Sequence, residues 1–93
     1  MGIRDFIDNL EEHREKLERG PELSAAEREE MLGEAEMMVG MAEAAVKELD
    51  SVLNNRRINL HEEHSIRFSQ DVFRHLIKEE EKLKVQLHEL ASR

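Results

Sequence analysis

The chain of 93 residues has no cysteine, tryptophan, tyrosine or threonine and only three phenylalanines. Without cysteine, it cannot form a disulfide, a thiolate metal site or a cysteine nucleophile. Because the aromatic and β-branched side chains that favour strands are scarce, whereas Ala, Leu, Met, Glu, Lys and Arg are plentiful, the composition indicates helices. We therefore predict an all-α fold in a single domain covering residues 1–93.

Long apolar runs are missing as well. No stretch approaches the roughly 20 apolar residues that a membrane span requires, and the first residues lack the apolar core of a signal peptide. The N-terminal segment is also too acidic for a helix that lies on a membrane surface. We expect a protein that does not bind membranes and that works in the cytoplasm of a cell or of an infected host.

The single proline and the glycine before it mark the end of the first predicted helix. A first helix should end just before Gly20-Pro21, because proline lacks a backbone donor and disfavours helix in the residue before it. Ser24 and Glu27 then have the spacing of a capping box, in which each side chain bonds the backbone amide of the other residue. A second helix is therefore predicted to begin at Ala25.

A second start signal lies in the other half of the chain. Asn59 and Glu62 repeat the cap spacing, after an Asn-rich stretch that interrupts the apolar pattern. The short connection favours an antiparallel hairpin of the two long helices. The architecture predicted is a short N-terminal helix followed by a long hairpin, as a three-helix or a dimeric bundle, with helices over about 3–19, 25–53 and 60–91.

The second predicted helix is apolar on more than one side. Its main stripe follows alternating spacings of three and four, and further apolar or small residues lie beside it. Because the first helix is too short to cover two long helices, we expect a homodimer or a higher homo-oligomer, with a three-helix monomer as the alternative. The residues predicted for self-association or partner binding are Met31, Met37, Met38, Val39, Gly40, Met41 and Ala44.

Two polar side chains fall on apolar faces. Glu80 interrupts the stripe of the third helix, and a buried carboxylate there would need a partner or a proton. We expect Glu80 instead to lie at the edge of the stripe and to reach water. His13 lies on the apolar side of the first helix; a core histidine with its hydrogen bonds satisfied is expected, and a pH sensor is the alternative.

A metal site is considered on the third helix. His61 and His64 are three residues apart, and Asp71 and His75 are four apart, which places each pair on one helical face. One helix supplies only neighbouring pairs, however, and a metal site needs at least three converging ligands. We therefore expect no metal and no cofactor, and keep a metal-binding bundle as an alternative whose weak candidate ligands are His61, His64, Asp71 and His75.

Signatures of catalysis are also missing. The chain has no glycine-rich phosphate loop, no Gly-x-Ser-x-Gly and no His-Glu-x-x-His. A narrow helical bundle rarely provides the concave pocket that catalysis prefers. The sequence predicts that the protein is not an enzyme and has no catalytic residues.

Charge is unevenly distributed. The chain carries 22 acidic and 14 basic residues, a formal net charge of −8, and 15 of the acids but only 6 of the bases precede residue 54. Phosphates would be repelled, so direct binding to nucleic acid is not expected. The predicted acidic face consists of Glu11, Glu12, Glu15, Glu27, Glu29 and Glu30.

These patterns support one functional hypothesis and two alternatives. The first is a small acidic protein without enzymatic activity that self-associates and binds a protein partner, as an adaptor, chaperone or regulator; flexible methionines suit surfaces that adapt to a partner. The second is an inhibitor of the kind that phages direct against host defence, whose acidic helices occupy a basic nucleic-acid-binding surface of a host protein. The third is the metal-binding bundle.

Overall fold

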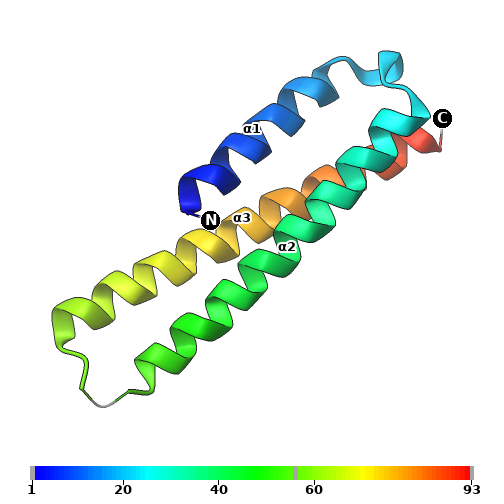
Figure 1. Cartoon of the computed structure of the whole chain (residues 1–93). Coiled ribbons are helices and arrows are strands. Elements are labelled where there is room, and N and C mark those ends of the chain that lie inside the picture. Colours follow the sequence, from blue (N-terminus) through cyan, green and yellow to red (C-terminus); the bar gives the residue numbers. More distant parts are fainter. Residues whose placement is uncertain (1, 56, 93) are drawn as a thin grey trace.

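A computed structural model describes residues 2–55 and 57–92, and Figure 1 shows their arrangement. The elements are α1 (Ile3–Glu18), a short 3₁₀ turn η1 (Gly20–Glu22), α2 (Ala25–Leu53) and α3 (Leu60–Ala91). Helices α2 and α3 form an antiparallel hairpin, and α1 packs against α3. The predicted all-α three-helix bundle is confirmed. The helix bounds differ from the prediction only at the end of α1, which stops at Glu18.

The two long helices begin where side chains cap them. Ser24 Oγ accepts a hydrogen bond from the amide of Glu27 at 3.1 Å, and the Glu27 carboxylate accepts the amide of Ser24 at 3.3 Å. At the start of α3, Asn59 Oδ1 accepts the amide of Glu62 at 2.8 Å. Each cap satisfies amides that the first turn of a helix leaves without an intrahelical partner. The chain therefore enters both helices at the predicted residues.

Removing the first cap gives a direct test of its contribution. The Ser24→Ala variant is expected to lose about 1 kcal/mol of the free energy of unfolding, because the amide of Glu27 loses its acceptor. Urea denaturation followed by circular dichroism measures this loss. The control is Ser51→Ala, since that exposed hydroxyl only donates to the carbonyl of Lys47 within its own helix, and a change below about 0.5 kcal/mol is expected. Equal losses in both variants would contradict the role of the cap.

The link between α1 and α2 is a tight turn. Gly20 adopts a φ of +52°, a left-handed conformation that glycine reaches without strain. The turn leads the chain back towards the hairpin and buries Leu23, which packs with Met31 of α2 and Leu87 of α3. The end of α1, the turn and the start of α2 are thus held at one end of the bundle.

The main core lies where all three helices meet. Phe6 and Phe73 anchor it with an edge-to-face contact, ring centroids 5.5 Å apart and planes at 84°, an arrangement that aromatic pairs prefer. This contact places the beginning of α1 beside the middle of α3. The buried members of this core are Phe6, Leu10, Met38, Ala42, Phe73, Leu76 and Leu83.

Helix α1 covers only part of the hairpin. Its 16 residues span about 24 Å, whereas the molecule is 53 Å long, so the end with the α2–α3 turn extends beyond it (Figure 1). In this uncovered part the buried Gln70 amide donates to the Asp50 carboxylate at 2.6 Å and to the carbonyl of Val46 at 3.2 Å. Across the residues that the structure describes, no helix has both the length and the apolar character needed to cross a bilayer.

Candidate functional site

Three residues predicted for self-association belong to the core of the chain itself. Met31, Met38 and Val39 have only 1%, 6% and 8% of their surface exposed, and Met31 packs against Leu23 and Leu87. Their assignment to a self-association surface is corrected, because they lie on the side of α2 that faces its own bundle. The apolar face of α2 is wide, and the sequence pattern does not tell which part of it the other two helices cover.

The remaining predicted residues lie nearer the solvent. Met37 is 55% exposed, Gly40 and Ala44 are exposed, and Met41 is partly buried beside the core. The exposed residues of α2 that follow one line at spacings of three and four, opposite its buried side, are here called the outer face of α2. They are Glu30, Gly33, Met37, Gly40, Ala44 and Lys47.

The two glycines of the outer face have open space around them. A Cβ atom added to either Gly33 or Gly40 would have no neighbour within 4 Å in the part of the chain that the structure describes. Neither glycine is therefore required by packing within the chain, although each lowers helix stability by about 1 kcal/mol relative to alanine.

The predicted acidic residues differ in their surroundings. Glu27 takes part in the cap of α2 and forms an ion pair with Arg19 at 2.7 Å. The backbone amide of Ser24 and then Arg19 lower the pKa of Glu27. That carboxylate is thus already engaged within the chain. The other five are exposed to solvent: Glu11, Glu12, Glu15, Glu29 and Glu30.

The candidate metal ligands on α3 do not form a site. His61, His64, Asp71 and His75 are all exposed, and no group of three or more possible ligands converges within residues 2–55 and 57–92. The ring of His75 lies 4.0 Å from Glu79. The structure does not bring the four predicted ligands together.

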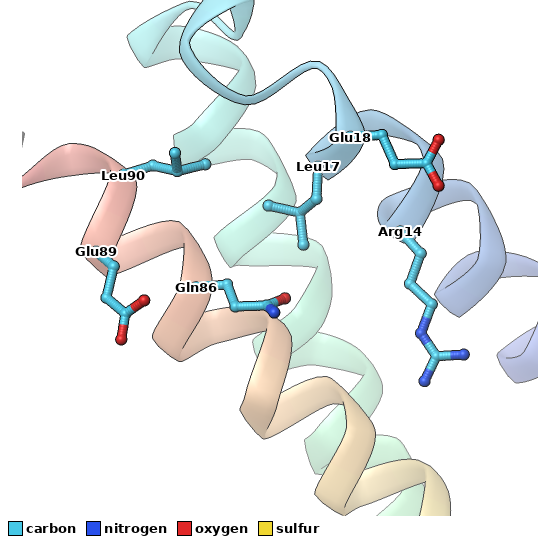
Figure 2. Close-up of a pocket in the computed structure, with 6 residues that line it drawn as sticks. All are labelled: Arg14, Leu17, Glu18, Gln86, Glu89 and Leu90. Carbon is cyan, nitrogen blue, oxygen red and sulfur yellow. The ribbon is translucent and has the colours of Figure 1, made fainter.

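An open groove of about 490 Å³ lies between α1 and the last turns of α3. Figure 2 shows Leu17 of α1 and Leu90 of α3 directed towards one another, with Arg14 at the edge that α1 forms. None of the lining side chains is a nucleophile beside a base. The groove is lined by Arg14, Leu17, Glu18, Gln86, Glu89 and Leu90.

One buried polar group joins all three helices. His13 of α1 is 1% exposed and Glu80 of α3 is 2% exposed. Nε2 of His13 donates to Oε2 of Glu34, on α2, at 2.7 Å. Nδ1 faces Oε2 of Glu80 across 3.9 Å, which is too far for a hydrogen bond and leaves an interaction between charges. The imidazole is therefore held between carboxylates from two other helices.

The burial of Glu80 corrects the prediction that this side chain reaches water. Neither carboxylate oxygen of Glu80 has a hydrogen-bond partner among the described residues. A buried carboxylate without hydrogen bonds is unfavourable, so a positive charge on His13 stabilises it. Glu80 in turn is the main cause that raises the pKa of His13; burial of the ring opposes the rise, and Glu34 adds to it.

The geometry of His13, Glu34 and Glu80 suits the binding of a proton and not that of a metal ion. Glu34 and Glu80 lie at different nitrogens of the same ring, so these two carboxylates and the imidazole do not point at one common position for an ion. No family model, curated protein or solved structure matches the chain. Two features of the molecule remain as candidates for function, the outer face of α2 and the buried group of His13, Glu34 and Glu80.

Proposed function

We propose that the protein is an interaction module without enzymatic activity, which forms a homodimer through the outer face of α2 and serves a protein partner as an adaptor, chaperone or regulator. The observation that carries the proposal is the uncharged centre of this face. There Met37, an apolar side chain 55% exposed, lies between Gly33 and Gly40, and Ala44 continues the same line. Small residues let a second helix approach closely, and a thioether adapts to the surface it meets.

The glycines support a contact between chains. Each is unfavourable inside a helix, and nothing among residues 2–55 and 57–92 occupies the space beside either of them. A second helix that packs into this space would gain close contact along the backbone of α2. The buried side of α2 already packs on α1 and α3, so the outer face is open to a second copy.

A second copy in antiparallel orientation is complementary to this face. One alignment places Met37 of each chain opposite Gly40 of the other, so that the largest uncharged side chain of the face meets a residue without a side chain. The same alignment places Gly33 opposite Ala44. At the ends of the contact it places Glu30 opposite Lys47, which pairs opposite charges. A two-fold axis repeats each of these contacts, as is usual in homodimers.

The flank of the outer face predicts how salt acts on the dimer. Glu29, Glu36 and Glu43 are exposed along one side of this face, and the antiparallel alignment brings the two acidic flanks near each other. Added salt screens this repulsion. We therefore expect association to strengthen between about 50 mM and about 500 mM salt, at ionic strengths whose screening lengths differ severalfold.

Sedimentation equilibrium at both salt concentrations tests the proposal. At tens of micromolar protein we expect twice the mass of one chain, with a larger dimer fraction at high salt. A monomer at both salt concentrations would overturn the proposal. Association that weakens as salt is added would show a contact driven by opposite charges, and would exclude the outer face as its main contact.

Alanine at the two glycines should have opposite effects on folding and on association. The Gly33→Ala/Gly40→Ala variant is expected to raise the free energy of unfolding of the monomer by about 1 kcal/mol per site. The same methyl groups should weaken the dimer, because they fill the space that Met37 and Ala44 of the other copy would occupy. Thermal melts at low concentration and sedimentation equilibrium measure the two effects.

The control for the glycine variant is Ser65→Ala, at an exposed position of α3 that lies outside the outer face of α2. It should leave the association constant unchanged. If the double alanine variant is more stable and yet dimerises as strongly as the original chain, the glycines do not lie in the interface.

A further inference from the structure

The buried His13 group is one of the contacts that hold α1 in place. Helix α1 buries only three side chains, Phe6, Leu10 and His13. The third is titratable, and it bridges to Glu34 of α2 and Glu80 of α3. The docking of α1 is thus linked to the protonation of one imidazole.

Besides His13, the contacts of α1 with the hairpin are those of Phe6 and Leu10 in the main core, with Ile3 and Leu17 partly buried beside it. Arg14 forms an ion pair with Glu79 of α3 in which the arginine is 52% exposed, and exposed pairs contribute little. Helices α2 and α3 instead pack along their lengths and have buried contacts of their own, such as Gln70 with Asp50. Because local stability is not uniform in a protein, we expect α1 to open before the hairpin does.

The groups around His13 leave its proton as the source of positive charge beside the buried carboxylate of Glu80. Glu34 faces the ring from α2 and Glu80 faces it from α3, so the side chains on both sides of the ring are those of acidic residues. On α1 itself, the neighbouring Arg14 is directed to Glu79. No lysine or arginine in the described parts of the chain lies within ion-pair distance of Glu80. A neutral His13 would leave the buried carboxylate of Glu80 without a compensating charge.

We propose that α1 is a pH-dependent latch, closed on the hairpin while His13 is protonated between Glu34 and Glu80, and released when the imidazole loses its proton. Release lets water reach the carboxylate of Glu80. It also uncovers the part of the apolar core that Phe6 and Leu10 cover in the closed form. The latch goes beyond the proposed self-association and does not depend on it.

The direction of the pH effect follows from linkage. In the closed form the pKa of His13 is raised above its ordinary value of 6.5, and in the open form the ring is exposed and titrates at that ordinary value. Below pH 6.5 both forms hold the proton and the latch has its full stability. Between pH 6.5 and the raised pKa the open form has lost its proton and the closed form still holds it. Opening therefore releases a proton in this interval, and the closed form becomes less stable as pH rises. The opening constant rises about tenfold per pH unit within this interval.

Hydrogen exchange of the full chain, read by mass spectrometry from about pH 6 to about pH 9 where histidine linkage is expected, tests the latch. Exchange rates divided by the intrinsic rates give protection factors for each helix. We expect the protection of α1 to fall as pH rises from 6.5 through the raised pKa of His13, by up to about tenfold per pH unit within that interval, and to level off above it. The paired parts of α2 and α3 should keep their protection. Protection of α1 that is constant over this pH range would overturn the proposal.

Two variants that remove a member of the buried pair and one control separate the latch from general effects of pH. Glu80→Gln removes the buried charge and should change the pH profile of α1 protection, because Glu80 is the main cause of the raised pKa of His13, although Glu34 still pairs with the ring. His13→Gln should abolish the pH profile by removing the titrating group. His75→Gln, at a ring that is 70% exposed, should keep the original pH profile. An unchanged pH profile in Glu80→Gln, a profile retained in His13→Gln, or a profile lost in His75→Gln would overturn the latch.

The proposal of the latch and the proposal of the dimer can be tested separately. Met37 lies on the outer face of α2, and the exchange experiment is repeated in a Met37→Glu background that disfavours the dimer. The same pH profile is expected there. Loss of the profile in that background would show that the pH effect belongs to association and would overturn the latch.

Discussion

Replacing His13 with alanine is expected to lower the free energy of unfolding by about 3–5 kcal/mol at neutral pH. The substitution removes the positive partner of Glu80, a carboxylate that is 2% exposed and has no hydrogen bond to the described residues. It also leaves a cavity where the ring, itself 1% exposed, had packed. Urea denaturation followed by circular dichroism measures the loss.

Changing Glu80 as well should restore most of this stability. A methionine at position 80 is close in size to glutamate and needs no charged partner, and replacing buried ion pairs by apolar side chains is often neutral or stabilising. The loss caused by His13→Ala should therefore be much smaller in a Glu80→Met background. His75→Ala, at an exposed position, is the control and should change stability by less than about 0.5 kcal/mol. Additive effects of the two substitutions would contradict the coupling of His13 to Glu80.

Replacing Met37 with glutamate is expected to weaken the proposed dimer by about 30-fold or more. The central apolar anchor of an interface contributes about 2 kcal/mol or more when it is a hot spot, and 1.4 kcal/mol corresponds to about tenfold in the dissociation constant. A carboxylate at this position would face Gly40 of the other copy without a partner, and would add to the acidic flank. Sedimentation equilibrium over a concentration series measures the change.

The control for this substitution is matched in exposure and in charge. Val85 of α3 is 56% exposed, against 55% for Met37, and it lies on a different helix from the outer face. Val85→Glu should dimerise as the original chain does, and circular dichroism should show both variants to be folded. An equal weakening in the two variants would indicate a general effect of added negative charge and not a contact at Met37.

The helix bounds could be predicted because their signals are local. Ser24 and Glu27 lie within one turn of each other, as do Asn59 and Glu62, and each pair forms its cap with no help from the rest of the fold. The same holds for the apolar spacing within each helix. Such patterns determine where helices begin and end, whichever way the helices later pack.

The burial of individual residues depended on tertiary packing and could not be predicted in the same way. Met31, Met38 and Met37 lie on the same wide apolar helix, and only the positions of α1 and α3 decide that the first two are buried. The pattern of α3 identified Glu80 as an interruption. It did not indicate that α1 would cover this residue and bring His13 beside it, because the alignment of two distant helices leaves no local signal.

The hydrogen bonds of Gln70 were missed for a related reason. Its partners, Asp50 and the carbonyl of Val46, lie on the other helix of the hairpin. A single polar residue beside the apolar stripe of α3 looks like a solvated position in the sequence. The available signal was the short connection of the hairpin, which places Gln70 across from the last turns of α2.

Disulfide trapping between two copies tests most directly whether the outer face of α2 forms the dimer. The chain has no cysteine of its own, so a Met37→Cys chain mixed with a Gly40→Cys chain can form only the bonds that contact between chains allows. A disulfide requires α carbons about 4.4–6.8 Å apart. We predict that the mixed Met37→Cys and Gly40→Cys disulfide is a major product under mild oxidation, and that Val85→Cys mixed with Gly40→Cys gives little. Equal yields from the two mixtures would contradict the proposed interface.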